Sequence, residues 1–361
     1  MNQMIIDDML IPERIIYAMN KCENNVRWKA SIQNYEVNTL RWAASIRNEV
    51  RTKTFKTKGF KRFDIMERGK IRHIQAVHIS ERTVQKLLCC YALRPVICKR
   101  IIYDNSASQK GKGTEFALKR LKEHLRWHYA RYGKSGTVIT IDYHDYFNSI
   151  PHEKVINTLL FKQTDETIRY YIKYFINAFD GDVGIGLGSE ISQLAAVLYP
   201  TTIDKIVKEK YKIHCYGRYN DDSYLIHQDR EYAIKCLNDI KTEAKALGII
   251  VNDSKTKIHN LASDDFVFLK KRVHLSDNGK ILLRLSKSNI IAEEKRITQM
   301  RDGYIKGEVP FSAIMQSYKS WRGYAQKYNA YKAVGNMDRF FVKNMRDIIK
   351  KETGNDYIKF H

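Results

Sequence analysis

The chain has 361 residues, enough for two or three domains and for a core that needs no disulfide or metal to stabilise it. Hydrophobic residues make up 43% and charged residues 29%, while only 5 Pro and 18 Gly exclude a collagen-like or low-complexity chain. The 63 Lys and Arg exceed the 40 Asp and Glu, a net charge of +23, which favours a polyanionic partner such as nucleic acid or an anionic membrane.

The sequence carries no sign of membrane insertion or secretion. No apolar run approaches the roughly 20 residues that a membrane-spanning helix needs, and the acidic N-terminal segment does not resemble a signal peptide. We therefore expect a cytoplasmic protein that does not enter a membrane. The cysteines form no Cys-x-x-Cys pair and no ladder with histidine, which argues against a disulfide framework or a zinc site. Reduced, buried side chains are expected at Cys22, Cys89, Cys90, Cys98, Cys215 and Cys236.

The first third of the chain is predicted to be helical, with two basic stretches. Apolar residues recur at helical spacing in the first fifty residues, with Pro12 near the start of the first helix. Residues 51–72 combine nine Lys and Arg with three Phe, and residues 99–134 are basic again, with a helix predicted from about Thr114. Such stretches are as typical of a solvated surface as of a nucleic-acid contact.

Residues 136–275 alternate strand-like and helix-like patterns, which is typical of an α+β fold. The pattern predicts a strand at 137–141, a helix after Gly188, a strand pair around 212–227 and a helix from about Arg230 to Leu247. There is no fixed-period repeat and no Pro- or Ser-rich linker, so the subdomains are expected to share one body.

The C-terminal part combines a third basic stretch, at residues 319–351, with aromatic residues at steps of three and four. This spacing predicts one helical face, used mainly for core packing and less for stacking on nucleic acid. The face would consist of Tyr318, Trp321, Tyr324, Tyr328 and Tyr331.

Two acidic segments carry the strongest chemical signal. Asp221 and Asp222 follow Tyr219 and Asn220 between two strand-prone runs, which predicts a tight turn with adjacent carboxylates. Asn-Asp is ordinary turn chemistry, but adjacent carboxylates also become favourable when divalent cations neutralise them. Asp142 directly follows the predicted strand at 137–141, and a glycine-rich turn at 184–188 lies between the two acidic segments. A metal site is the favoured interpretation of this combination.

The order of these segments resembles the palm motifs of reverse transcriptases, which typically read Asp-x-x-x-Phe-Phe-Asp-x-Ile, Gly-x-x-x-Gly-Ser-x-x-Ser and Tyr-x-Asp-Asp. Residues 247–256 are similar to the fourth palm motif and residues 268–270 to the primer-grip turn. Residues 68–72 and 80–85 resemble fingers motifs, and residues 320–331 resemble thumb helices, of bacterial enzymes related to group II intron reverse transcriptases.

This resemblance implies an α+β, right-hand polymerase with helical fingers, an antiparallel-sheet palm and a helical thumb. The expected divisions are N-terminal helices and fingers at 1–135, palm at 136–283, and thumb with a C-terminal tail at 284–361.

The same resemblance assigns catalysis to Asp142, Asp221 and Asp222. With the backbone carbonyl of Tyr143, these carboxylates would bind two Mg²⁺ ions, for which Mn²⁺ could substitute. Two such ions lower the pKa of a primer 3′-hydroxyl and stabilise the leaving pyrophosphate.

Three basic residues match family positions that contact the incoming nucleotide. Lys70 and Arg72 would hold its triphosphate, although the local basic density makes a plain surface role equally compatible with Lys70. Lys255 matches the lysine proposed as general acid toward pyrophosphate.

Further nucleotide contacts are implied in and around the glycine turn. Phe147 occupies the family's position beneath the sugar, where its bulk would exclude a 2′-hydroxyl and favour deoxynucleotides, while the neighbouring Tyr146 is expected to face the core. Gly188 would allow close approach of the backbone to the nucleotide. Leu187 and Gln193 depart from the commonest retroviral and intron pattern and are closer to diversity-generating and phage-defence enzymes, which leaves fidelity open.

The implied function is RNA-directed DNA synthesis in a bacterial retroelement or an anti-phage defence system. The partners would be an RNA template, expected to be a cognate non-coding RNA, a DNA or RNA primer, and dNTPs; a protein partner or a second copy could also take part. Two alternatives stay open: untemplated or protein-primed DNA synthesis, and a non-catalytic RNA-binding assembly protein. The presence of all three carboxylates argues against the second alternative.

Overall fold

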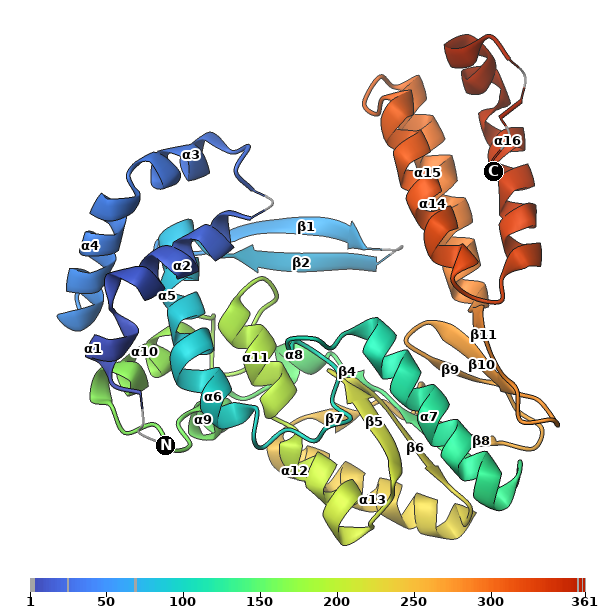
Figure 1. Ribbon diagram of the computed structural model, residues 1–361, viewed down its shortest axis with the longest axis horizontal. Coiled ribbons are helices and arrows are strands. Elements are labelled where there is room, and N and C mark those ends of the chain that lie inside the picture. The colour runs from blue at the N-terminus through green and yellow to red at the C-terminus, as the bar shows by residue number, and fades with distance from the viewer. Residues whose placement is uncertain (1–3, 25, 68–69, 356, 359, 361) are drawn as a thin grey trace.

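The computed structural model describes residues 4–24, 26–67, 70–355, 357–358 and 360 (Figure 1). The N-terminal elements are α1 (Ile6–Met9), α2 (Pro12–Glu23), α3 (Ala30–Val37), α4 (Thr39–Arg51), β1 (Lys61–Glu67), β2 (Lys70–Ala76), α5 (Ile79–Leu87), the π-helical turn η1 (Leu88–Leu93), α6 (Arg94–Ile97) and α7 (Thr114–Tyr132).

The remaining elements form the middle and the end of the chain. They are β3 (Thr137–Ile141), β4 (Tyr143–His144), α8 (Tyr146–Ser149), α9 (His152–Leu159), α10 (Glu166–Ile176), α11 (Glu190–Leu198), α12 (Thr201–Lys205), the π-helical turn η2 (Ile206–Lys210), β5 (Cys215–Tyr219), β6 (Asp222–His227), α13 (Arg230–Leu247), β7 (Ile250–Val251), β8 (Lys257–Asn260), β9 (Phe266–Phe268), β10 (Lys271–Leu275), β11 (Ile281–Leu285), α14 (Lys287–Ile305), α15 (Phe311–Gln326) and α16 (Tyr331–Thr353).

The central sheet consists of four antiparallel strands in the order β5-β6-β3-β8. Successive side chains of a strand point to opposite faces, and here both faces are covered. On β3, Val138 packs into one hydrophobic core and Ile139 into the other; on β6, Tyr224 and Leu225 divide in the same way. This explains why β3 and the middle of β6 are apolar runs instead of alternating apolar and polar residues.

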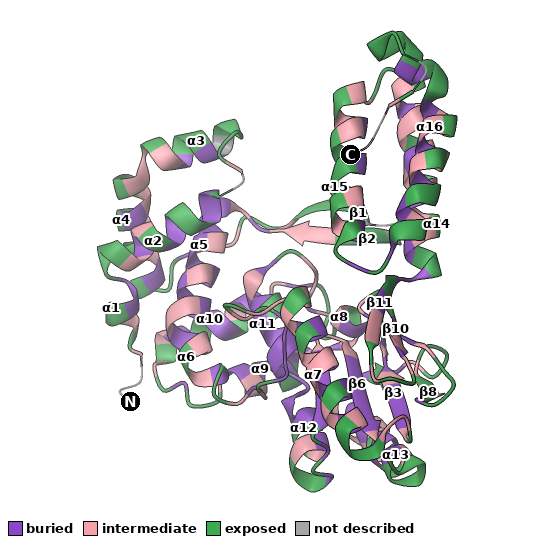
Figure 2. Ribbon diagram, turned by 45° about the vertical axis from the view of Figure 1, so that its right-hand side comes forward, coloured by how far each residue is buried: buried purple, intermediate pink, exposed green. Residues whose placement is uncertain are grey.

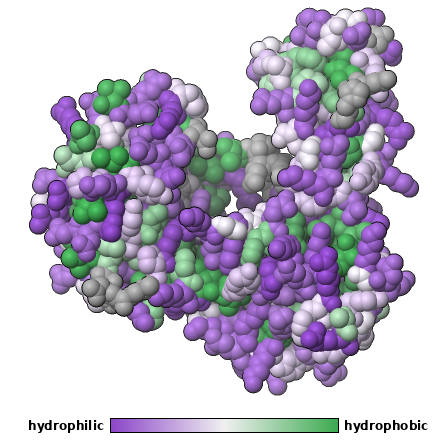
Figure 3. Space-filling view, viewed as in Figure 1, coloured by the Kyte–Doolittle hydropathy of each residue, from purple (hydrophilic) through white to green (hydrophobic). Residues whose placement is uncertain are grey.

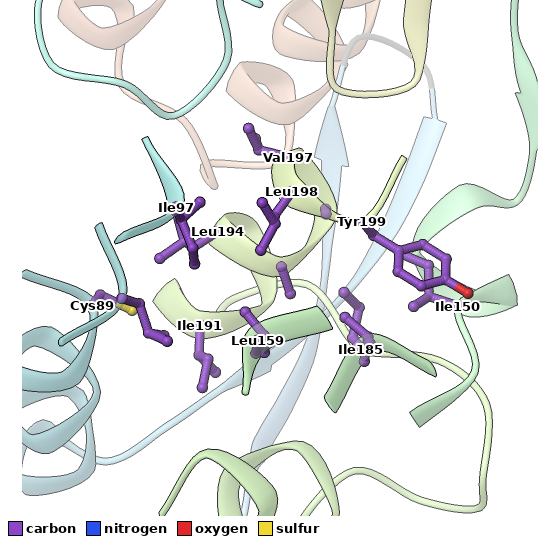
Figure 4. Close-up of a cluster of buried hydrophobic side chains, with 14 of the residues drawn as sticks. Cys89, Ile97, Ile150, Leu159, Ile185, Ile191, Leu194, Val197, Leu198 and Tyr199 are labelled. Carbon is purple, nitrogen blue, oxygen red and sulfur yellow. The ribbon is translucent and has the colours of Figure 1, made fainter. Parts of the chain in front are cut away.

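The first core joins one face of the sheet to the N-terminal helices and to α9, α10, α11 and α13. Helix α11 lies at its centre, and Figure 4 shows Ile191, Leu194 and Leu198 among side chains from neighbouring elements. Because this helix directly follows residues 184–188, its burial anchors the glycine turn in the middle of the molecule.

The second core joins the other face of the sheet to α7, to the sheet β11-β10-β9 and to the thumb helices α14, α15 and α16. The thumb helices are buried along their inner faces and exposed outside (Figure 2). In the space-filling view the surface is hollowed between the N-terminal helices and the thumb (Figure 3). The α+β fold with an antiparallel palm sheet and a helical thumb is therefore confirmed.

The fingers are not wholly helical, which corrects the sequence prediction. Strands β1 and β2 form an antiparallel hairpin that extends from the N-terminal helices toward the thumb (Figure 1). Its inner end is held by the glycine turn, since the Gln75 amide donates to the Leu187 carbonyl at 2.7 Å. Helical periodicity is absent from this basic stretch, but its weak strand pattern was obscured by charged residues.

Two smaller predictions also need correction. Tyr328 and Tyr331 do not belong to the single helical face, because α15 ends at Gln326. Tyr328 lies in the following loop, and Tyr331 begins α16 with 80% of its surface exposed. All six cysteines are free thiols, but Cys98 is exposed instead of buried, and Cys90 is only half-buried. In the described part of the chain, no helix is long and apolar enough to cross a membrane.

Candidate active site

The register of the central sheet brings the acidic segments together. Strand β3 pairs antiparallel with β6, with Ile141 opposite Ser223, so Asp142 and Asp222 lie at the same end of the two strands. Strand β6 also pairs with β5, and Tyr219 opposite Asp222 leaves a two-residue turn. Asn220 in that turn has φ +53°, a left-handed conformation that Asn tolerates better than most residues.

Electrostatic interactions among the carboxylates shift the pKa values of Asp221 and Asp222. Burial, with the charges of Asp221 and Asp142, raises the pKa of Asp222 to about 7. Burial and the charge of Asp142 also raise the pKa of Asp221. The charges of Lys270 and Lys255 oppose the rise at Asp222 without cancelling it. Concentrated negative charge of this kind is what a divalent cation would relieve.

Lys255 lies beside Asp142, although 113 positions separate them in the chain. Its Nζ is 3.2 Å from Asp142 Oδ1. The segment that carries it is fixed by backbone contacts: the Asn252 amide donates to the Asp142 carbonyl at 2.8 Å, and β7 pairs with β4. The fold thus brings Lys255 against Asp142, two candidate site residues that are far apart in the sequence.

Arg72 reaches the site from the fingers hairpin. Its charge lowers the pKa of Asp221, against the larger effect of burial, so the guanidinium acts on the carboxylate turn. Lys70 is the first residue of β2, but its side chain lies outside the described part of the structure, as do the neighbouring Arg68 and Gly69.

Gly188 and Gly186 pack closely against Gln75 of the fingers hairpin. A Cβ on Gly188 would stand 2.8 Å from the Gln75 carbonyl oxygen, and one on Gly186 would stand 2.3 Å from Gln75 Oε1. Both glycines have positive φ, at +123° and +43°. Glycine is therefore required at position 188, where the fingers backbone packs onto the turn, and it is favoured at position 186 by the positive φ and the close side chains of Gln75 and Phe179. Sequence reasoning missed Gln75, and no local pattern in the sequence indicates this contact.

Phe147 lies on α8 beside the same turn. Its carbonyl accepts a hydrogen bond from the Ile185 amide at 3.0 Å, and its ring is half-buried. Tyr146 faces the core as expected: it is 3% exposed and its hydroxyl donates to the Ala196 carbonyl at 2.6 Å. Gln193 is exposed on the first turns of α11, after the glycine turn.

A buried ion pair is hydrogen-bonded to the carboxylate turn. Arg218 on β5 is 1% exposed and binds Asp204 of α12 through two hydrogen bonds, of 2.8 and 2.7 Å. The same guanidinium donates to the Val197 carbonyl at 2.9 Å and to the Asn220 carbonyl at 3.2 Å. The Tyr216 hydroxyl also donates to Asp204, at 2.8 Å. Sequence reasoning missed this pair; a lone arginine in a strand that is otherwise apolar was the only signal.

The donor set fits a divalent cation in its chemistry, although the carboxylates do not form a closed cage. Within the described ranges, no three His, Cys, Asp or Glu side chains are close enough to hold a metal ion as they stand. The three aspartates are nevertheless hard oxygen ligands that share one site and repel one another. Tyr143, the residue after Asp142, belongs to the first core, and its buried hydroxyl has no hydrogen-bond partner among the described residues.

Residues 56–282, well over half of the chain, match the sequence profile of the family described as reverse transcriptase (RNA-dependent DNA polymerase). No curated protein matches the chain.

Two solved telomerase structures are similar in shape. The apo telomerase from Candida tropicalis, truncated from its C-terminal domain, shares 13% identity, with a TM-score of 0.47 over 67% of this chain and 60% of that one. The telomerase from Candida albicans in complex with a TWJ fragment of telomeric RNA shares 10% identity, with a TM-score of 0.46 over 85% of this chain and 61% of that one. The chain thus matches about three fifths of each telomerase.

Proposed function

Since this chain belongs to the reverse transcriptase (RNA-dependent DNA polymerase) family, we propose that it extends a primer 3′-hydroxyl with deoxynucleotides along an RNA template. The observation that carries the proposal is the strand register, which places Asp142 at the same sheet end as Asp221 and Asp222. These residues belong to two segments that resemble, in order, catalytic motifs of the family.

The three aspartates, with the backbone carbonyl of Tyr143, would hold two Mg²⁺ ions, and Mn²⁺ could replace them. Bound divalent ions lower the pKa of the attacking hydroxyl and stabilise the leaving pyrophosphate. The protein supplies a rigid position for the ligands, because the hairpin turn rests on the buried Arg218 and Asp204 pair.

Basic residues around the carboxylates would bind and neutralise the triphosphate. Arg72, whose charge reaches Asp221, and Lys70 from the same strand would hold it from the fingers side. Lys255 keeps its ammonium beside Asp142 and would donate a proton to the leaving pyrophosphate. Gly188 and Gln193 would line the nucleotide site at the start of α11.

Phe147 would select deoxynucleotides, and the Phe147→Ala variant tests this. Removing the ring should leave room for a 2′-hydroxyl and raise rNTP use relative to dNTP use by about 10- to 100-fold, the range that pocket contacts of this size provide. The measurement is the ratio of kcat/KM for dGTP and rGTP in single-nucleotide addition. Phe161→Ala, on an exposed ring 43% accessible, is the matched control and should leave the ratio unchanged. An unchanged ratio in Phe147→Ala would refute this role.

The partners of the reaction would be an RNA template, expected to be a cognate non-coding RNA, and a DNA or RNA primer. A net charge of +23 supports the binding of such polyanions. The biological setting that we propose is a bacterial retroelement or an anti-phage defence system. It is supported by the sequence from Leu187 to Gln193, which is similar to that of diversity-generating and phage-defence enzymes.

The test of the function is incorporation of labelled dNTPs with Mg²⁺ on a primed RNA, followed by sequencing of the product, for the wild type and Asp221→Asn. Product complementary to the RNA and absent in the variant is the expected result. Product unrelated to the RNA would instead favour untemplated or protein-primed synthesis. Full biological activity in Asp221→Asn would favour an RNA-binding assembly protein that does not use its carboxylates.

A further inference from the structure

A buried lysine lies where the thumb meets the palm. Lys271 is the first residue of β10, and its side chain is 0% exposed. Its Nζ donates to the Tyr324 hydroxyl at 2.5 Å and lies 3.8 Å from the centroid of that ring. On another side, the Tyr328 ring centroid is 3.6 Å away. The ammonium of a palm strand is thus enclosed by two tyrosines of the thumb.

The thumb is attached to the rest of the chain by two further contacts at this junction. The Tyr328 hydroxyl donates to Glu115 of α7 at 3.5 Å, and the Asn329 amide donates to the Leu283 carbonyl of β11 at 2.9 Å. These contacts gather at the C-terminal end of α15. The orientation of the thumb is therefore set where the lysine is enclosed.

The turn that precedes Lys271 lies near the catalytic carboxylates. Lys271 directly follows this two-residue turn, Leu269 and Lys270, between the paired residues Phe268 and Lys271. Both turn residues have left-handed φ angles, +48° and +62°. Residues other than Gly adopt this conformation at a cost in free energy, which the surrounding structure has to offset. The turn lies near the carboxylate end of the central sheet, because the ring of Phe268, the residue before the turn, packs against Tyr224 of β6 with 4.9 Å between the ring centroids.

Packing alone does not explain a lysine at this position, because burying its ammonium costs free energy. Removing the charge from water costs free energy that only close partners recover, and a Met or Leu would fill the same space without that cost. The two tyrosine faces are suitable partners, because a desolvated cation over an aromatic ring is attracted more strongly than an exposed one. The same enclosure keeps these rings from stacking freely on nucleic acid.

We propose that Lys271 is a positioning residue that latches the thumb to the turn at Leu269 and Lys270, so that a thumb engaged with nucleic acid keeps the primer end at the catalytic carboxylates. This inference rests on the proposed function, because a primer end exists only for a polymerase. The latch itself is a property of the folded chain and can be measured without nucleotides.

The activity test compares Lys271→Met with the wild type on primed RNA, in the presence of a heparin trap. The run length, which is the number of nucleotides added per binding event, should fall about tenfold. A change of this size corresponds to the free energy of one desolvated cation–π contact. The rate of adding the first nucleotide at saturating primer–template should stay within about threefold of the wild type, because no ligand of the reacting atoms is changed. Lys280→Met, an exposed lysine of the same hairpin, is the matched control and should change neither.

Tyr324→Leu removes the same contact from the thumb side. It provides a second, independent test in case the Lys271→Met variant does not fold. Because Lys271→Met already deletes the contact that Tyr324→Leu deletes, the double variant should lose hardly more run length than Lys271→Met alone. Additive losses would overturn the proposal, as would an unchanged run length in Lys271→Met. A parallel fall of first-nucleotide rate and thermal stability would also overturn it, since that would indicate a purely structural role.

Hydrogen exchange of the full-length protein without nucleic acid separates the latch from the proposed function. The amides at the end of α15 and in the following loop should exchange about tenfold faster in Lys271→Met than in the wild type, because local opening is easier there. Equal exchange would overturn the latch even if polymerase activity were established. Faster exchange in a protein whose wild type adds no nucleotide would support the latch and refute the proposed function alone.

Discussion

Replacing Asp222 by Asn is expected to lower the rate of nucleotide addition by about 10²- to 10³-fold, the effect of losing several kcal/mol of transition-state charge stabilisation. An amide keeps the shape of the carboxylate but cannot supply the negative charge that a divalent cation requires. Asp222 starts β6 and pairs with Tyr219, and these backbone contacts do not depend on its charge. The fold should therefore remain unchanged.

Single-turnover addition of one nucleotide on primed RNA measures this effect without contributions from product release. Asp277→Asn is the matched control, because the Asp277 side chain is 96% exposed on the palm surface. The control should retain the wild-type rate. A rate in Asp222→Asn within a few-fold of the wild type would contradict the assignment of this carboxylate.

Thermal unfolding should show that the loss is chemical and not structural. In metal-free buffer, Asp222→Asn should unfold at a temperature no lower than the wild type, because it removes a buried charge that Asp221 and Asp142 repel. Added Mg²⁺ should raise the midpoint of the wild type more than that of the variant, since a ligand that binds only the folded state stabilises it. Equal shifts would place the metal elsewhere.

Replacing Arg218 by Met is expected to have the largest effect on stability, a loss of about 3–5 kcal/mol in the free energy of unfolding. The substitution leaves Asp204 charged and buried without its bidentate partner. It also removes the donor that binds the Val197 and Asn220 carbonyls. An uncompensated buried charge accounts for most of the expected cost.

Urea unfolding followed by circular dichroism gives the free energy, provided that the slope with denaturant is unchanged. Arg62→Met is the matched control: its ion pair with Asp180 is exposed, and such pairs add little stability. The double variant Arg218→Met with Asp204→Leu should recover much of the loss, because it removes the orphaned charge. No recovery would mean that the hydrogen bonds to the backbone dominate instead.

The sequence by itself determined the local elements of the site. The predicted strand at 137–141 is β3, the predicted helix from Arg230 to Leu247 is α13, and the paired strands around the turn are β5 and β6. These segments are strongly patterned, and their ends are marked by residues with clear preferences. Adjacent carboxylates at a tight turn, in order with other motifs, were enough to single out the catalytic candidates.

The tertiary structure alone decided which distant residues meet. Lys255 at Asp142, Gln75 at Gly188, and Arg218 at Asp204 join segments that are separated by at least 14 positions. None of these pairings follows from a helical or strand period, because periodicity reports which face of an element is buried but not what covers it.

The two cores explain why the remaining features could not be read from the sequence. The central strands β3 and β6 are covered on both faces, so their apolar runs do not reveal that one face meets the fingers and the other meets the thumb. Lys271 appears in the sequence as one more basic residue, and only the packing of α15 against β10 encloses it between two tyrosines. The chemistry of the carboxylates is therefore local, whereas the parts that hold them in place depend on how the two faces of one sheet are covered.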